Sequence, residues 1–141
     1  MLESPPKALK YARIVAALAT SRLIGLVLLT APTTSIPSWY STTFGIGDVL
    51  TGIFAIPVAW ALGRGGVRIY ALAATWAALG FLDLVYAVAI STQVTGLYAG
   101  VSNFFGVGII ILPIAMVIQL VVLILLLTPP VAKYMGRSRI P

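Results

Sequence analysis

The chain has 141 residues, of which 60% are apolar and 9% are charged, and its mean hydropathy is +1.08. A soluble domain is about a quarter charged, so this composition excludes an ordinary soluble fold and makes lipid the expected solvent for most of the surface. The net charge of +6 does not indicate nucleic-acid binding, because the basic residues stand at the ends of apolar segments and not on one polar face.

Several kinds of chemistry are excluded by the absence of cysteine and histidine. Without them the chain has no disulfide framework, no thiol nucleophile, no imidazole ligand for zinc or haem and no Ser-His-Asp triad. The only carboxylates are Glu3, Asp48 and Asp83. The sequence therefore predicts no catalytic residue, no metal site and no cofactor.

Four apolar runs follow one another, each near the roughly 20 residues that a helix needs to span a bilayer. They are continuously apolar, without the alternation of a transmembrane β-barrel. The runs cover about residues 13–31, 45–62, 69–91 and 105–127, and the segments between them are loops at 32–44 and 92–104 and a glycine turn at 63–68. The prediction is an all-α fold, a four-transmembrane-helix bundle that forms a single membrane domain.

The first run could instead be a secretory signal peptide, because it has a basic start, an apolar core and small residues near Ala31. Arg22 argues against this alternative, since it interrupts what should be an uncharged core. We therefore expect the first run to be a transmembrane helix.

The basic residues define an orientation. Apart from Arg22, they lie up to the start of the first apolar run, in the glycine turn and after the last run, as Lys7, Lys10, Arg13, Arg64, Arg68, Lys133, Arg137 and Arg139. The loops at 32–44 and 92–104 carry no charge. In a four-span arrangement all three basic regions lie on one side, which is the positive-inside pattern. The sequence thus predicts a multi-pass protein of the cell membrane with both termini in the cytoplasm.

A weak internal repeat relates the two halves of the chain. Phe44-Gly45-Ile46-Gly47 recurs as Phe105-Gly106-Val107-Gly108, and the same offset places Arg22 on Asp83. A repeat of two spans duplicates in parallel orientation. The fold could therefore be two copies of a helical hairpin, with the two opposite charges meeting near the axis between them.

Three charged residues lie inside the apolar runs. Arg22 and Asp83 sit about 13 Å and about 12 Å below the outer ends of their helices, and Asp48 only about 5 Å below, at about 1.5 Å rise per residue. A lone charge at the bilayer centre costs about 3 kcal/mol on insertion scales. We therefore predict an ion pair between Arg22 and Asp83, with Asp48 close above it.

Small residues recur on the helix faces that carry the two aspartates. Small side chains let helix backbones approach closely in lipid, so we predict that Gly45, Gly52, Ala55 and Gly80 make helix-packing contacts. Two prolines fall inside apolar runs and free backbone carbonyls there. Candidate kinks or gates are accordingly Pro57 and Pro113, the latter with Gln119 six residues further on.

These motifs together resemble a family of small, uncharacterised prokaryotic membrane proteins. The matching segments are Ser21-Arg22-Leu23-Ile24-Gly25, Gly45-Ile46-Gly47-Asp48 through to Gly52, Trp76 through to Leu84 (with Gly80, Asp83 and Leu84 as G-x-x-D-L) and Pro113 through to Gln119. Ala77 stands where the family pattern has Asn, and Gln119 where it has His. Both departures remove polar groups that a catalytic or metal role would use. The resemblance implies a four-helix membrane protein and no known activity.

Two classes of function stay open. A structural or accessory membrane subunit, or a self-associating bundle, accounts for the small-residue faces, with the bilayer and a homo-oligomer or larger membrane complex as partners. A small proton- or solute-conducting transporter or channel accounts for Asp48 and Asp83. A membrane enzyme is disfavoured, because no nucleophile–base pair is visible.

The topology is testable by cysteine labelling, since the chain has no cysteine of its own. Ser35→Cys and Thr95→Cys should react with a membrane-impermeant thiol reagent added to intact cells, because both loops lie outside in this arrangement. Gly65→Cys should react only after the membrane is permeabilised. Labelling of Gly65→Cys in intact cells would contradict the four-span topology with cytoplasmic termini.

Overall fold

The computed structural model describes residues 4–30, 38–94 and 108–137. Within these segments every regular element is helical and no strand occurs, which confirms the all-α prediction for this part of the chain. The elements are α1 (Lys7–Leu18), the 3-10 helix η1 (Ala19–Ile24), α2 (Gly25–Thr30), α3 (Ser38–Ala61), α4 (Val67–Val94), α6 (Gly108–Leu127) and α7 (Pro129–Arg137).

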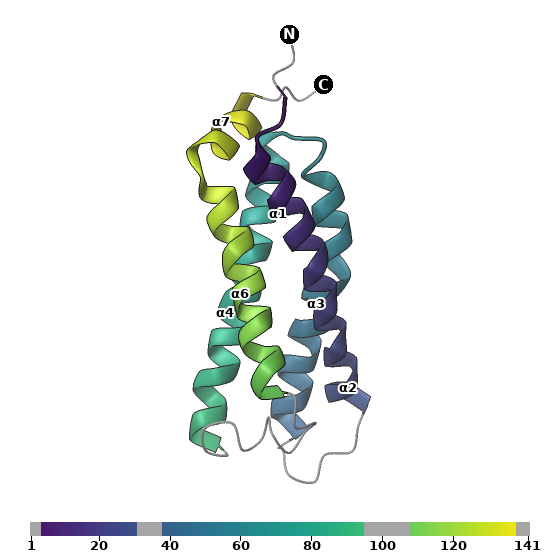
Figure 1. Ribbon diagram of the computed structural model, residues 1–141. Helices are drawn as coiled ribbons and strands as arrows, with labels where there is room; N and C mark the ends of the chain where they lie inside the picture. The colour runs from purple at the N-terminus through teal and green to yellow at the C-terminus, as the bar shows by residue number, and fades with distance from the viewer. Residues whose placement is uncertain (1–3, 31–37, 95–107, 138–141) are drawn as a thin grey trace.

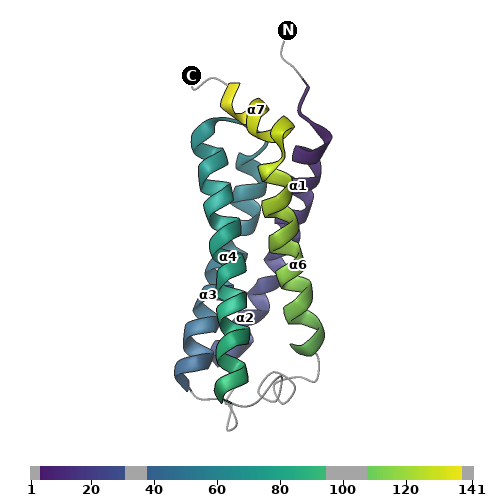
Figure 2. The same cartoon turned by 90° about the vertical axis from the view of Figure 1, so that its left-hand side faces the viewer.

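The elements form an elongated helical bundle. The column α1–η1–α2, α3, α4 and α6 run side by side along the long axis, and the start of α1 and the short α7 lie at the same end (Figure 1). Helix α1 packs against α3 and α6, and α4 packs against α3 and α6. Helix α7 crosses the end of the bundle obliquely (Figure 2) and contacts α1, α4 and α6.

The core of the bundle is built largely from alanine. Its fully buried members include Ala12, Ala16, Ala73 and Ala77, beside leucines such as Leu62. Large apolar side chains instead cover the outside, where Leu72 is 69% exposed and Leu79 is 62% exposed. Small residues inside and large apolar residues outside are the arrangement expected of helices that pack in lipid.

The first column is longer and less regular than predicted. It begins at Lys7 instead of about Arg13, and the 3-10 helix η1 interrupts it. The interruption includes a close approach to α3: a Cβ atom added at Gly52 would lie 2.9 Å from the backbone nitrogen of Leu23. This tight contact fixes the path of the chain at the point where a regular α-helix gives way.

The prediction of a loop over residues 32–44 is wrong for its last part, because α3 begins at Ser38 and not at about Gly45. The hydroxyls in this stretch bond to the helix itself. Ser41 Oγ donates to the carbonyl of Ser38 at 3.0 Å, and Thr43 Oγ1 donates to that of Trp39 at 2.7 Å. A Ser/Thr-rich stretch can therefore continue a helix when its side chains bond to the preceding turn.

The proline pair at the end of the chain has two effects. Helix α6 ends at Leu127 as predicted, but Pro129 and Pro130 then begin α7, which bends away by 64°. Proline suits the first turn of a helix, where its missing N–H needs no partner. Val131 and Met135 are fully buried against the bundle, so the segment predicted as a tail is part of the packed structure.

The internal prolines stay within continuous helices. Pro57 lies inside α3 and Pro113 inside α6, and both are exposed on the outside of the bundle. Their proposed roles as kinks or gates stay predictions.

By length and apolar composition, two helical segments of the described chain could cross a membrane, Ser41–Ala61 and Val67–Ile90. The bent pair α6 and α7 adds a third if it counts as one span. These findings support membrane association. The column α1–η1–α2 is not such a helix, because it is broken into short pieces and carries Arg13 and Arg22.

Candidate functional site

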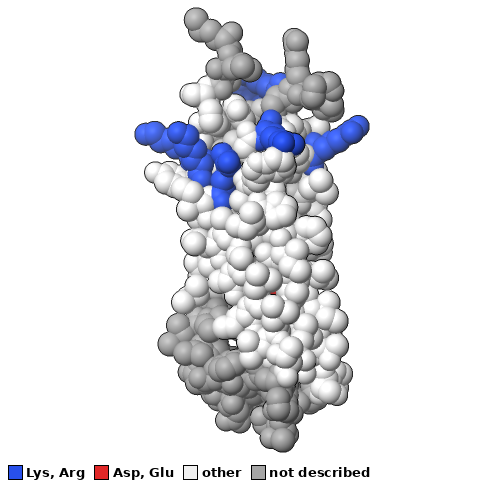
Figure 3. Space-filling view, turned by 90° about the vertical axis from the view of Figure 1, so that its right-hand side faces the viewer, with Lys and Arg blue, Asp and Glu red and all other residues white. Residues whose placement is uncertain are grey.

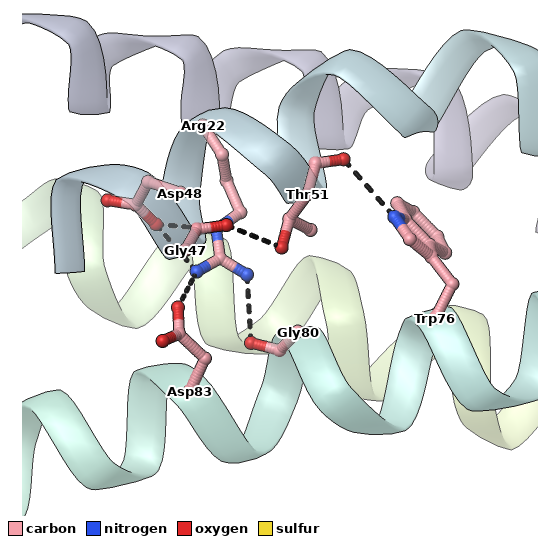
Figure 4. Close-up of polar contacts among 7 residues, drawn as sticks. All are labelled: Arg22, Gly47, Asp48, Thr51, Trp76, Gly80 and Asp83. Atoms are coloured by element: carbon pink, nitrogen blue, oxygen red, sulfur yellow. Dashed lines mark hydrogen bonds and ion pairs between the residues drawn. The ribbon is translucent and has the colours of Figure 1, made fainter. Parts of the chain in front are cut away.

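The site is centred on Arg22, which extends from η1 between α3 and α4 and is only 2% exposed (Figure 4). Its Nη2 donates to Asp83 Oδ2 at 2.5 Å, and its Nε donates to Asp48 Oδ1 at 2.7 Å. Nη1 donates to the backbone carbonyl of Gly80 at 2.8 Å. The predicted ion pair between Arg22 and Asp83 is confirmed, and Asp48 belongs to the same cluster.

The predicted depth of Asp48 is wrong. Because α3 begins at Ser38, Asp48 lies about 15 Å along the helix instead of about 5 Å. It is thus level with Arg22, and a second contact joins Asp48 Oδ1 to Arg22 Nη2 at 2.6 Å. One guanidinium therefore holds two carboxylates from two different helices.

Glycines make room for this ionic cluster, by which we mean Arg22, Asp48 and Asp83. A Cβ atom added at Gly47 would lie 2.6 Å from Asp83 Oδ1, so α3 and α4 approach closely only because this position has no side chain. On the other side of the cluster, a Cβ atom at Gly80 would lie 3.1 Å from Arg22 Nη1. The contact at Gly47 explains why a glycine precedes Asp48 in the G-x-G-D segment: a side chain there would meet the carboxylate of Asp83.

The predicted packing residues are all buried. Gly45 lies against Leu29 of α2, and Gly52 lies against Leu23 of η1. Ala55 is fully buried, and Gly80 lies beneath Arg22. The sequence analysis missed Gly25, where an added Cβ atom would meet the side chain of Asp48 and lie 3.1 Å from the carbonyl of Gly45.

Two further polar residues support the cluster without touching it, and the sequence analysis did not single them out for this. Thr51 Oγ1 donates to the carbonyl of Gly47 at 2.8 Å, and Trp76 Nε1 donates to the carbonyl of Thr51 at 3.2 Å (Figure 4). The second bond ties α4 to α3. Trp76, at the start of the segment that runs through to Leu84, was the available signal, because an indole N–H that is removed from water needs an acceptor.

Gln119 lies at the edge of the ionic cluster. Its side chain is fully buried in α6, and its Nε2 would lie 2.7 Å from a Cβ atom added at Gly80. Neither its amide nitrogen nor its amide oxygen has a hydrogen-bond partner, and neither does the hydroxyl of Thr20. Such groups are commonly satisfied by buried water.

The cluster is unbalanced in formal charge, with two carboxylates and one guanidinium. The carboxylate side chains are also less enclosed, at 17% exposure for Asp48 and 25% for Asp83 against 2% for Arg22. In the described segments, no three residues of the metal-binding types His, Cys, Asp and Glu come together. Chemically, the arrangement can hold helices together or accept one positive charge.

These features define a helical, membrane-associated protein with a buried arginine–aspartate cluster. The chain belongs to the family described as Domain of unknown function (DUF8737), which matches residues 4–127. This agrees with the resemblance to an uncharacterised family, and it covers the cluster together with Gln119. No curated protein and no solved structure matches the chain.

Variants of the three cluster residues should lower the stability of the protein by different amounts. Arg22→Leu should lower the free energy of unfolding by about 3–5 kcal/mol, because it leaves two largely enclosed carboxylates without a counter-ion. Asp83→Asn should cost less, since Asp48 remains as counter-ion to Arg22 and the amide oxygen still accepts a hydrogen bond. Replacing all three cluster residues by leucine should restore much of the loss. Thermal unfolding in detergent measures the melting temperature of each variant and so ranks their stabilities.

The matched control is Arg68→Leu, which removes an exposed arginine and should leave the melting temperature almost unchanged. The double variant Arg22→Leu/Asp83→Leu should recover only part of the loss, because Asp48 then has no counter-ion. Equal losses in Arg22→Leu and Arg68→Leu would show that the cluster contributes nothing to stability.

Proposed function

We propose that the chain is a non-enzymatic integral protein of the cell membrane, with four spans in a single domain and both termini in the cytoplasm. In this proposal it acts as a structural or accessory subunit, either as a self-associating bundle or within a larger membrane complex. Its partners are then the lipid bilayer and other membrane helices.

The fourth span of this proposal is the column α1–η1–α2. It runs beside α3 for most of its length (Figure 1). Its intramembrane charge, Arg22, is turned inward and paired, so it does not face lipid. The basic residues of the described chain, Arg22 apart, lie at the end of the bundle that carries α7, which supports placing this end in the cytoplasm.

The observation that carries the structural role is that all three nitrogens of the Arg22 guanidinium are used. Nε, Nη1 and Nη2 all donate to protein acceptors, on α3 and on α4. A guanidinium used in this way has little capacity left for a substrate, whereas it joins three segments of the bundle. A buried ionic group in this position specifies which faces of the helices meet.

Cross-linking in native membranes tests the structural role. A photoreactive residue is placed in turn at exposed positions of different helices, for example Leu18, Ile53, Leu72 and Ile124. A subunit or self-associating bundle should give a discrete protein adduct at one face, and a homodimer should have twice the chain mass of 14.9 kDa. Adducts with lipid alone at every position would contradict the proposal.

A second candidate function is proton conduction, and it rests on the excess carboxylate. Asp48 and Asp83 outnumber Arg22 and are more exposed than it is. Gln119 and Thr20 add buried polar atoms without a protein partner, where water could bind.

Conduction is measured in vesicles that contain the purified protein and a pH-sensitive dye, with an imposed potassium diffusion potential. If the second candidate is right, the wild type should acidify the vesicles, and Asp83→Asn should reduce the rate toward that of empty vesicles. Asp48→Asn should do the same while leaving the folded yield intact. Arg68→Gln is the matched control. A wild type no faster than empty vesicles would contradict conduction and leave the structural role.

A further inference from the structure

We infer that Arg13 and Arg64 form a binding site for the phosphate of an anionic phospholipid, on the outside of the α1–α3 contact at the basic end of the bundle. This inference rests on the proposed membrane placement and goes beyond it, because it assigns a ligand to two particular side chains.

Arg13 is held in place by backbone on α3. Its Nε donates to the carbonyl of Ala59 at 2.9 Å, although α1 and α3 are far apart in sequence. The guanidinium lies directly over Gly63, where an added Cβ atom would be 2.8 Å from both Cζ and Nη2. Because Nε is already used, the outer edge of the guanidinium, with Nη1 and Nη2, remains available for an anion.

Arg64 is held in place by an aromatic ring. Its Cζ lies 3.6 Å from the ring centroid of Trp60, four residues earlier in the chain. This cation–π contact holds the guanidinium over the ring. Two arginines are therefore preorganised by different devices, which lowers the entropy cost of binding a ligand between them.

The two guanidinium groups belong to the surroundings of one turn, which follows α3. Arg13 lies against Gly63, and Arg64 is the next residue of the chain. The Arg13 guanidinium therefore lies beside the residue that precedes Arg64. A phosphate in front of this turn can be reached from both sides, and arginine recognises phosphate through paired N–H donors.

The surroundings favour a lipid headgroup as the source of the phosphate. Basic side chains project from the bundle near one end, above a long stretch of surface that shows almost no charged side chain (Figure 3). Trp60 and Tyr11 are each 58% exposed, and aromatic residues of this kind occupy the headgroup level of a bilayer. In the described part of the chain both carboxylates lie in the ionic cluster, so none there competes for these arginines.

The site is tested with the full chain in detergent by native mass spectrometry, which counts lipids that stay bound. Wild type should retain phosphatidylglycerol in preference to phosphatidylcholine. Arg13→Gln should weaken this retention about tenfold, because it removes a charged two-donor contact. Gly63→Ala should weaken it as well, although no charge changes, because its Cβ displaces the Arg13 guanidinium.

Arg68→Gln removes the same charge from an exposed position on α4 and should leave retention as in the wild type. Loss in Arg68→Gln as large as in Arg13→Gln would overturn the site in favour of general attraction to a basic surface. Unchanged retention in both Arg13→Gln and Gly63→Ala would also overturn it. Displacement of the lipid by millimolar inorganic phosphate would show a phosphate site that is not a lipid site. A wild type that fails to enter bilayers of neutral lipid would instead contradict the membrane placement itself.

Discussion

The fold depends on one constraint, which is that a guanidinium cannot stay unpaired in the middle of an apolar bundle. A single charge at that depth costs about 3 kcal/mol or more, so Arg22 must find anionic partners on neighbouring helices. It finds Asp48 on α3 and Asp83 on α4. Since each bond fixes both the rotation and the height of a helix, three segments are placed relative to one another by one side chain.

Close approach of the backbones follows from these short bonds. The contacts of Arg22 bring η1 and α4 so near to α3 that side chains must be missing at the crossing points. Gly47 faces the carboxylate of Asp83, and Gly52 faces the backbone of Leu23. The glycines and the charges are thus parts of a single arrangement, because neither fits without the other. The large apolar side chains are excluded from this interior and lie on the outside, such as Leu72 and Leu79.

The helical class and the pairing of Arg22 with Asp83 could be predicted from the sequence, because long, continuously apolar runs and the cost of a buried charge leave few alternatives. The depth of Asp48 could not, since it depends on where α3 begins. That helix begins at Ser38, and hydroxyls in its first turns bond to its own carbonyls. The packing of α7 was also missed, because Pro129-Pro130 signal the end of one helix as readily as the start of the next. In both cases a local sequence signal was compatible with two structures.

The structural role and the conducting role differ most in the environment that each requires for the Gln119 side chain. If the bundle interior is dry, a fully buried amide without partners costs free energy that an apolar residue of similar size would avoid. A purely structural core would gain from such a replacement. If water reaches the amide, the same residue extends the polar region of Arg22 and Asp83 across to α6, since Gly80 lies between them. The hydration of this one side chain therefore determines whether the cluster is a closed ionic contact or part of a polar path.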